Sequence, residues 1–496
     1  MNDLEKRKLQ SKSNRNRHSR RPFRPRETFS WSHFLSCYNT YMKKIQIIIL
    51  SVVIFALPCT SFATEPATII QAPSVPTLIT KVQEAKQLLA PLKLNYALTP
   101  HYKTTVQART KTKKQVLTNY TLDIKDIALA ILDPAGNIHI TAVMQKGSNF
   151  EFPDKNFSVT KTSFNGVNSR FTVQKPAGGK VIALKYLITP TESGSRVAIE
   201  KAMYPVDYVP YSPELSSPEV VAYGASYLNT VIDTVASQLK NTASQSVPGK
   251  LITEAIPPSI IKALAYAEHT SSANIQSLGS LEQMNVLLAT NGPDTYKYSV
   301  SSDGYFSRGI AQFIPSTYAS LISRHKDLNF IQDFKLGMED HVNSVKAMYV
   351  LLDDYAGSIR QKAPQNFLES RTFEYGAAAY NGGVTRVAKA LSAYGDAWNN
   401  RDRLNTINSL QAQANTASAQ IKKLSTKIKS TKEAGAKTAL KKDLATAQAN
   451  KNSAESELAT LTNATLRNET INYLNKIYSV IHLLNAESKP TQLALQ

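Results

Sequence analysis

Cysteine is almost absent from the sequence, since Cys37 and Cys59 are the only two among 496 residues. Both precede a cleavage site for export that the sequence predicts directly after Ala63, so the exported chain contains no thiol. This excludes a cysteine nucleophile, a zinc site with cysteine ligands and a disulfide from that part of the chain. A cysteine-free exported protein fits the periplasm of a Gram-negative bacterium.

Acidic residues are scarce as well, with 37 Asp and Glu against 58 Lys and Arg and a net charge of +21. The first 63 residues hold 12 Lys/Arg and 3 Asp/Glu, so the remainder carries +12. This charge favours anionic partners such as a cell-wall polymer or a membrane surface, without selecting among them.

Long apolar runs are rare, and the clearest one is Ile45–Leu57. Two lysines precede it, and the small residues Ser61 and Ala63 follow at the −3 and −1 positions of a cut, which predicts a cleaved signal peptide at 42–63. The run is shorter than the roughly 20 residues of a membrane span. An uncleaved anchor is the alternative, as is a lipid anchor on Cys59, which the preceding proline disfavours.

The segment 1–41 is strongly basic. One interpretation is a nucleic-acid-binding arm. The other is an upstream extension, with Met42 as the true start, and we favour it because an export signal usually begins at its own methionine. We therefore expect no nucleic-acid partner.

Period-two patterns separated by turn residues predict strands at 121–132, 138–144, 170–174 and 180–188. They indicate an antiparallel sheet, which we expect to be a small sandwich, within a β-rich module at 64–205. No catalytic constellation occurs in it, so we expect a binding, docking or structural module. The stretch 205–213 is typical of an extended linker, and a helix is expected at 218–239.

A 3-4 spacing of apolar residues runs through 404–465, with an interruption at Glu433–Gly435. It predicts two helices of heptad pattern that form an antiparallel hairpin. The expected seam residues are Ile407, Leu410, Ala414, Ala417, Ile421, Leu424, Ile428, Leu440, Leu444, Ala447, Ala454, Leu458 and Leu461. Such an arm typically contacts a protein partner, acts as a spacer or mediates self-association.

A helix is also predicted from Ser259 through Glu268, after two prolines. With a period of 3.6 residues, Ile261, Leu264 and Glu268 share one face. A carboxylate on an apolar face loses hydration, which raises its pKa and suits it to act as a general acid. The alternative is a glutamate at the edge of the face that reaches water.

Two later segments complete a pattern: Gly309–Thr317 contains Gly-Ile-Ala-Gln and Pro-Ser-Thr, and Ala379–Gly383 reads Ala-Tyr-Asn-Gly-Gly. Together with Glu268, and in this order, they resemble lytic transglycosylases of the soluble type, which have a goose-type-lysozyme-like fold. That family has a catalytic glutamate at the end of such a helix, then a Gly-Leu-Met-Gln-type segment leading to Pro-x-Thr, and later Ala-Tyr-Asn-x-Gly. A fourth match, Glu469–Tyr473, is similar to the family's closing Glu-Thr-x-x-Tyr.

The resemblance implies a peptidoglycan lytic transglycosylase that cleaves between N-acetylmuramic acid and N-acetylglucosamine and forms a 1,6-anhydro sugar. Glu268 would act first as acid and then as base, with glycan strands of peptidoglycan as the partner. Gln312, Tyr380 and Asn381 would bind substrate, as would Ser301 if a small insertion is allowed. Alternatively, Gln312 caps a local turn, and Tyr380 and Asn381 serve only in packing and in the turn before Gly382. Glu469 is expected to be a buried structural acid.

Two departures from the family pattern stand out. His269 follows the glutamate, where the family usually has serine, and Ser271–Ser299 is longer than usual. A water-using muramidase on the same fold stays open as one alternative, because the sequence does not separate it from a lytic transglycosylase. The inserted segment favours a second alternative, a non-catalytic peptidoglycan-binding scaffold of an envelope-spanning secretion machine. In the second, the β-rich module or the hairpin would recruit a protein partner.

No cofactor is expected, because the sequence has no glycine-rich phosphate loop. No metal site is expected either, because its histidines lack acidic or histidine partners at ligand spacing.

The patterns together predict a multidomain α+β protein in which an all-α lysozyme-like domain follows the β-rich module. The expected organisation is a basic extension (1–41), a signal peptide (42–63), the β-rich module (64–205), a linker and helix (206–250), the lysozyme-like domain (251–403), the inserted hairpin (404–465), its closing helix (466–485) and a tail (486–496).

Overall fold

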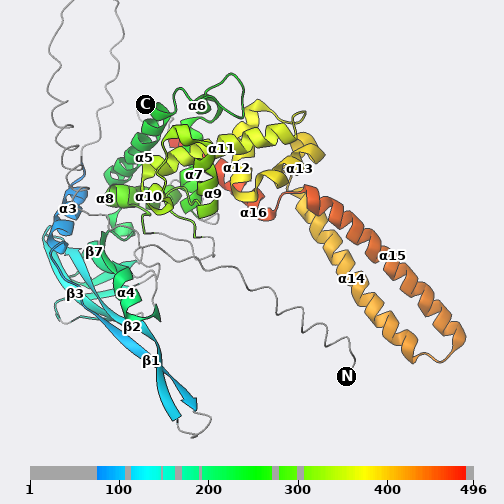
Figure 1. Ribbon diagram of the computed structural model, residues 1–496, viewed down its shortest axis with the longest axis horizontal. Helices are drawn as coiled ribbons and strands as arrows, with labels where there is room; N and C mark the ends of the chain where they lie inside the picture. The colour runs from blue at the N-terminus through cyan, green and yellow to red at the C-terminus, as the bar shows by residue number, and fades with distance from the viewer. Residues whose placement is uncertain are drawn as a thin grey trace, which may run out of the picture. The chain divides into compact units, whose positions relative to one another are not determined.

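The computed structural model describes residues 75–106, 113–146, 149–152, 154–161, 170–188, 193–270, 279–298 and 306–487. These residues form an α+β fold in which an antiparallel sheet precedes a helical region (Figure 1). The predicted basic extension and signal peptide, the part of the predicted tail after Glu487, and Ser301 lie outside the described residues, whereas 486 and 487 end the last helix.

Within the described residues the sheet has seven strands, all antiparallel, and its central strand β2 pairs with β1, β3, β7 and β8. The middle of β2 (127–131) and of β7 (181–185) is buried at every position, on both faces, and not at every second residue as the period-two pattern predicts. The strands are β1 (Tyr96–Val106), β2 (Lys113–Leu132), β3 (Ile138–Lys146), β4 (Asn149–Glu151), β7 (Lys180–Ile188), β8 (Ser193–Gly194) and β9 (Tyr204–Tyr208).

The expected sandwich is wrong for the residues that the structure describes. A helix, α3 (Thr77–Leu89), packs against β2, β3 and β7, and its buried face consists of Ile79, Val82, Ala85 and Leu89. Apart from the sheet there is a two-stranded ribbon, β5 (Ser158–Lys161) with β6 (Phe171–Lys175). An amphipathic helix thus covers apolar sheet surface that a second sheet would cover in a sandwich.

The expected linker at 205–213 begins with a strand instead. Strand β9 pairs with β7 from Tyr204 opposite Ile188 to Tyr208 opposite Leu184. Val206 and Tyr208 are both buried, so this short segment alternates as a strand does. Pro205 within β9 and Pro210 just after it concealed the pattern, because proline is rare inside sheets but is allowed on an edge strand such as β9.

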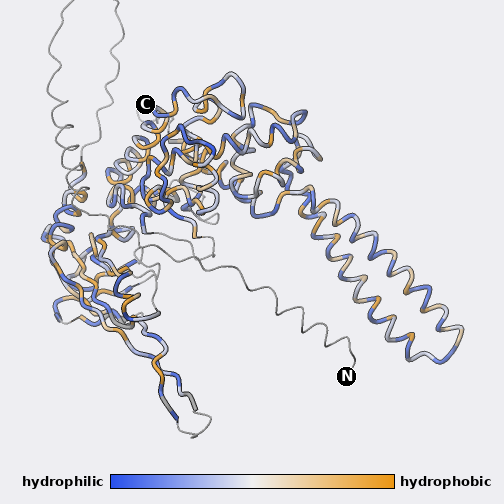
Figure 2. The backbone as a smooth tube through the Cα atoms, in the orientation of Figure 1, coloured by the Kyte–Doolittle hydropathy of each residue, from blue (hydrophilic) through white to orange (hydrophobic). Residues whose placement is uncertain are grey.

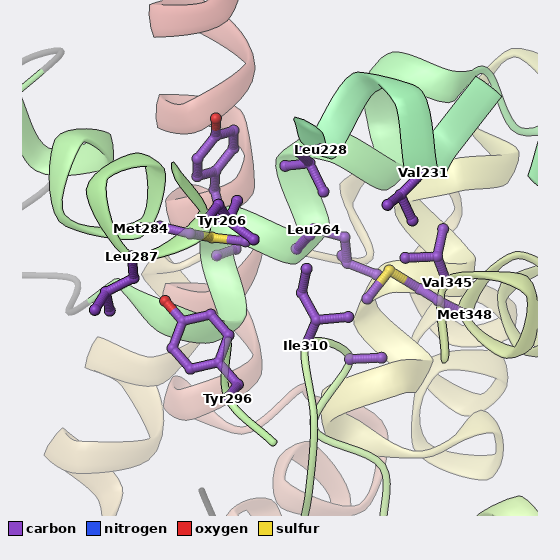
Figure 3. Packing of buried hydrophobic residues seen from close by; sticks show 14 of the residues in the cluster. Leu228, Val231, Leu264, Tyr266, Met284, Leu287, Tyr296, Ile310, Val345 and Met348 are labelled. Atoms are coloured by element: carbon purple, nitrogen blue, oxygen red, sulfur yellow. The ribbon is translucent and has the colours of Figure 1, made fainter. Parts of the chain in front are cut away.

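The helical region surrounds α7 (Pro258–His269), which begins with proline at its first position and is buried on nearly all sides. Helices α5, α8, α11 and α16 pack against it. In Figure 3, Leu264 of α7 lies among side chains of the neighbouring helices, and Ile310 points into the same cluster. The helices around the site are α5 (Pro218–Gln238), α6 (Ile252–Ala255), α8 (Gly279–Asn291), α9 (Pro315–Arg324), α10 (Phe334–Glu339), α11 (His341–Lys362), α12 (Thr372–Gly382), α13 (Val384–Tyr394) and α16 (Asn468–Glu487). A short helix, α4 (Arg196–Ala202), belongs to the sheet module.

Two long helices, α14 (Asp402–Ser430) and α15 (Ala434–Ala464), lie between α13 and α16 in the sequence and pack along each other as a hairpin (Figure 1). Every residue expected in their seam is buried or half-buried, and Leu410, Ala414 and Ala454 form the centre of a small separate core. Apolar and polar residues alternate along both helices in Figure 2. The turn comprises 431–433, so Gly435 lies inside α15 and not in the break where the sequence suggested it.

Candidate functional site

A cleft of about 430 Å³ lies in the helical region. Four of the residues singled out from the sequence line it together: Glu268, Gln312, Tyr380 and Asn381. They come from α7, from the loop before α9 and from the end of α12, so segments more than a hundred residues apart meet at one place. The other lining residues are Ser307, Phe313, Ile314, Thr317, Leu351 and Tyr355.

Glu268 occupies the last turn of α7, and a small part of its surface remains accessible at the cleft. The three residues before it are fully buried, so its carboxyl group lies where a packed helix end meets the opening. Burial raises the pKa of Glu268 to about 7, against the opposing effects of a hydrogen bond from Tyr473 and the charge of Lys476. The carboxyl group is therefore substantially protonated near neutral pH. Among the described residues that line the cleft, it is the only carboxyl group.

Helix α16 supplies two of the neighbours of Glu268. The phenolic hydroxyl of Tyr473 donates a hydrogen bond to Oε1 of Glu268. Lys476 is half-buried one turn further on, where burial lowers its pKa while the charge of Glu268 opposes that change. Tyr473 thus orients the carboxyl group and stabilises its ionised form.

The loop 309–312 approaches the helical core closely. A Cβ on Gly309, whose φ is +71°, would lie 2.3 Å from the carbonyl oxygen of Met338, so only glycine fits. Ile310 is fully buried, and its carbonyl oxygen lies 3.0 Å from Nε2 of His269. The His269 ring stacks on Tyr296 with centroids 3.5 Å apart. Burial lowers the pKa of His269 to about 3, so the ring is neutral and donates to the Ile310 carbonyl group.

Gln312 lines the cleft and also caps its own turn. Its Nε2 donates to the carbonyl oxygen of Gly309 at 2.8 Å, and its Oε1 accepts a hydrogen bond from the hydroxyl of Ser307 at 3.1 Å. The local interpretation of this residue therefore holds alongside its place in the cleft. One amide hydrogen and one lone pair stay outside these two bonds.

Tyr380 and Asn381 tie α12 to the neighbouring segments. The Tyr380 hydroxyl donates to the carbonyl oxygen of Ala311, and its ring meets Phe313 edge to face. Burial, reinforced by the negative charge of Glu268, raises the pKa of Tyr380 well above its ordinary value. The side-chain oxygen of Asn381 accepts a hydrogen bond from Thr470 of α16 at 2.9 Å.

The small residues of α12 allow this convergence. A Cβ on Gly376 would lie 2.8 Å from the carbonyl oxygen of Leu352 in α11, and one on Gly382 would lie 2.5 Å from the hydroxyl oxygen of Thr470 in α16. The glycines in the segment Gly376–Gly383 therefore permit α12 to contact both helices.

Glu469 is not the buried acid expected from the sequence. It is exposed in the first turn of α16, while its neighbour Thr470 is fully buried. A carboxylate in that turn stabilises the helix through the partial positive charge of the helix N-terminus, which is a structural role that needs no burial.

Sequence reasoning assigned no role to several residues that the structure places at the site. Tyr473 and Thr317 belong to quoted motifs, but nothing in their spacing indicates a contact with the cleft. Ser307 and Tyr355 carry no sequence signal, because their positions depend on how the loop before α9 and helix α11 pack. Ser301, the expected serine, lies outside the described residues, whereas Ser307 lines the cleft.

Within the described ranges, no three His, Cys, Asp or Glu side chains gather into a group able to hold a metal ion. In the same residues, no helix combines the length and apolarity that crossing a membrane requires. Comparison with protein-family models, with curated proteins and with solved structures finds no match for this chain.

Proposed function

We propose that this protein is a lytic transglycosylase that cleaves the β-1,4 bond between N-acetylmuramic acid and N-acetylglucosamine in peptidoglycan. The observation that carries the proposal is Glu268, a single carboxyl group in a cleft with a pKa of about 7 and a hydrogen bond from Tyr473. The motif residues Gln312, Tyr380 and Asn381 surround the same cleft, which supports the proposal. The helical region would then have the lysozyme-like fold that the motifs imply.

In the first step, Glu268 gives its proton to the glycosidic oxygen as the bond from that oxygen to the anomeric carbon of the muramoyl residue breaks. A general acid is most effective when its pKa lies near the working pH, and a value of about 7 meets this condition. The acetamido oxygen of the muramoyl residue assists at the anomeric carbon. The resulting carboxylate of Glu268 keeps its hydrogen bond from Tyr473.

In the second step, the carboxylate of Glu268 takes the proton of the muramoyl 6-hydroxyl group as that oxygen bonds to the anomeric carbon. One residue therefore acts as acid and then as base, no water is consumed, and Glu268 regains its proton. Ordinary glycosidases use two carboxyl groups roughly 5–10 Å apart. The cleft offers one among its described lining residues, which favours the intramolecular route over two-carboxylate hydrolysis.

A second candidate function is a scaffold that binds glycan without cleaving it. Its support is that Gln312 and Tyr380 already bond to Gly309, Ser307 and Ala311 within the protein, as residues with a purely structural role do. The ionisation of Glu268 argues for the enzyme, because a binding site gains nothing from a buried acid that titrates near neutrality.

The test is digestion of purified sacculi by the wild-type protein, with the released muropeptides identified by mass spectrometry. Anhydro-muropeptides are the expected products. Products that contain one more water would replace the proposal with a muramidase, and no release at any pH would replace it with the scaffold. The Glu268→Gln variant should lose this cleavage. The Glu469→Gln variant is its matched control, because it makes the same chemical change at an exposed glutamate and should cleave like the wild type.

A further inference from the structure

The lysines of the α14–α15 hairpin are concentrated around its turn. Residues 422–442 contain eight lysines and one acidic residue, Glu433, which gives this segment a net charge of +7. By contrast, 404–421 contains no charged residue. All eight lysines are exposed: Lys422, Lys423, Lys427, Lys429, Lys432, Lys437, Lys441 and Lys442. We call this surface the lysine tip.

The lysine tip is not neutralised by the chain itself. Among the described residues, none of its eight lysines takes part in an ion pair, whereas Lys451, nearer the base of the hairpin, pairs with Glu455 at 3.5 Å. The half-buried Ile421, Leu424 and Ile428 face the seam between the helices, so the outer surface of the tip is cationic. An uncompensated charge of this density destabilises the isolated hairpin, and an anionic surface would relieve the repulsion.

The composition of the hairpin indicates what kind of anion fits. Residues 404–465 contain no arginine and no aromatic residue. Discrete phosphates and carboxylates are usually bound by the planar fork of arginine, and nucleic acids are bound with arginine and stacked aromatic rings. Flexible lysines spread over two helices act as separate point charges, which suits a surface of many mobile anionic groups.

We propose that the lysine tip binds the headgroups of an anionic phospholipid membrane. The contact is electrostatic and peripheral, because the only exposed apolar side chains of the tip are the small alanines Ala434 and Ala439. A helix rises 1.5 Å per residue, so the 29 residues of α14 extend over roughly 40 Å. The hairpin is thus long enough to separate a membrane-bound tip from the helices that form its base.

The experiment is sedimentation of the full chain with vesicles of phosphatidylcholine alone or mixed with phosphatidylglycerol. The tip variant replaces Lys422, Lys427, Lys437 and Lys441 by glutamine, which has similar helix propensity, and circular dichroism checks its helix content. The control variant replaces four exposed lysines elsewhere, Lys155, Lys201, Lys240 and Lys250, so that both variants lose the same charge.

The wild type should bind vesicles that contain phosphatidylglycerol, and added salt should weaken the binding. The tip variant should bind them about tenfold to a thousandfold more weakly, while the control stays within a few-fold of the wild type. The basic segment 1–41 and the apolar run 45–57 are identical in all three chains, so the difference between the tip variant and the control variant reports the contribution of the tip.

Equal losses in both variants, or no preference for phosphatidylglycerol, would overturn the proposal. So would lysine-dependent binding to sacculi or to duplex DNA without any to phosphatidylglycerol, since the tip would then serve another polyanion. None of these binding measurements depends on catalysis. A negative result for membrane binding therefore leaves the proposed function untouched, and loss of the proposed function leaves membrane binding untouched.

Discussion

Tyr473 donates its phenolic hydrogen to Glu268 across a separation of 205 residues in the sequence. The two residues meet because α16, which follows the α14–α15 hairpin in the sequence, packs against α7. The segment that follows the hairpin therefore completes the surroundings of the acid. The hydrogen bond also controls ionisation, because it opposes the rise in pKa that burial causes.

Replacement of Tyr473 by phenylalanine should raise the pKa of Glu268, since the carboxylate loses a donor. The alkaline limb of the pH–activity profile reports loss of the proton from the general acid, so it should move upward by about one pH unit. Sacculus cleavage measured over a pH series checks this. Tyr102→Phe, at an exposed tyrosine of β1, is the control and should leave the profile unchanged. A profile of Tyr473→Phe identical to the wild type would remove this residue from the mechanism.

The Glu268→Gln variant should be more stable than the wild type in alkaline solution. The pKa of Glu268 is about 7 in the folded protein, against an ordinary value of 4.5. Between these values the folded state holds the proton more tightly, so wild-type stability falls as the pH rises from 4.5 to 7. The variant escapes this loss, which is on the order of 1–3 kcal/mol.

Urea unfolding at pH 8 and pH 4 measures the effect, and the difference between the two proteins should vanish at the lower pH. Glu469→Gln is the control with the opposite sign, because removal of a carboxylate from a helix N-terminus costs about 0.3–1 kcal/mol at neutral pH. If Glu268→Gln has no stabilising effect at pH 8, the pKa of Glu268 is not raised.

The His269→Phe variant should lose less stability in acid than the wild type does. The pKa of His269 is about 3 in the folded protein, against an ordinary value of 6.5. As the pH falls from 6.5 toward 3, His269 becomes protonated in the unfolded chain but stays neutral in the folded chain. The free energy of unfolding of the wild type therefore declines. Phenylalanine retains the stacking on Tyr296 but leaves the Ile310 carbonyl group without its donor, at a cost of about 1–2 kcal/mol near neutral pH.

Denaturant unfolding at several pH values tests this expectation. The stability gap between wild type and His269→Phe should be largest near neutral pH and should narrow as the solution becomes acidic. A gap that stays constant from neutral pH to pH 4 would show that His269 does not titrate with a lowered pKa.

Replacement of Gly309 by alanine should destabilise the protein by about 2 kcal/mol or more, because a positive φ and a backbone clash combine. Gly435→Ala is the contrasting control. Gly435 lies inside α15 with nothing within 4 Å of an added Cβ, so alanine there should stabilise by about 0.5–1 kcal/mol. Thermal unfolding of both variants measures the contrast, and equal effects would contradict the close approach of the loop to Met338.

The sequence was most informative where one periodicity determines burial. The hairpin seam, including Leu410 and Ala414, and the apolar face of α7 follow from spacing alone, because each helix has one dominant partner or is buried throughout. It was least informative where the environment is tertiary. The exposure of Glu469, the pairing of β9 and the contribution of Tyr355 to the cleft depend on neighbours that no local pattern encodes.

At the site itself, the motifs identified Glu268, Gln312, Tyr380 and Asn381, and the structure brings these four together. Their hydrogen-bond partners were beyond sequence reasoning. Gln312 bonds within its own turn, and Asn381 bonds to Thr470, a contact that requires the close approach of α12 to α16 at Gly382.

The most direct test of the central claim is a paired measurement of binding and cleavage of the same purified sacculi by the wild type and by Glu268→Gln. Glutamine retains the size of the side chain and the acceptor for Tyr473 but has no proton to give. The variant should sediment with sacculi like the wild type, while its release of anhydro-muropeptides should fall by about a hundredfold to a thousandfold, as expected for loss of a general acid. Undiminished release by Glu268→Gln would contradict the account and place the acid elsewhere.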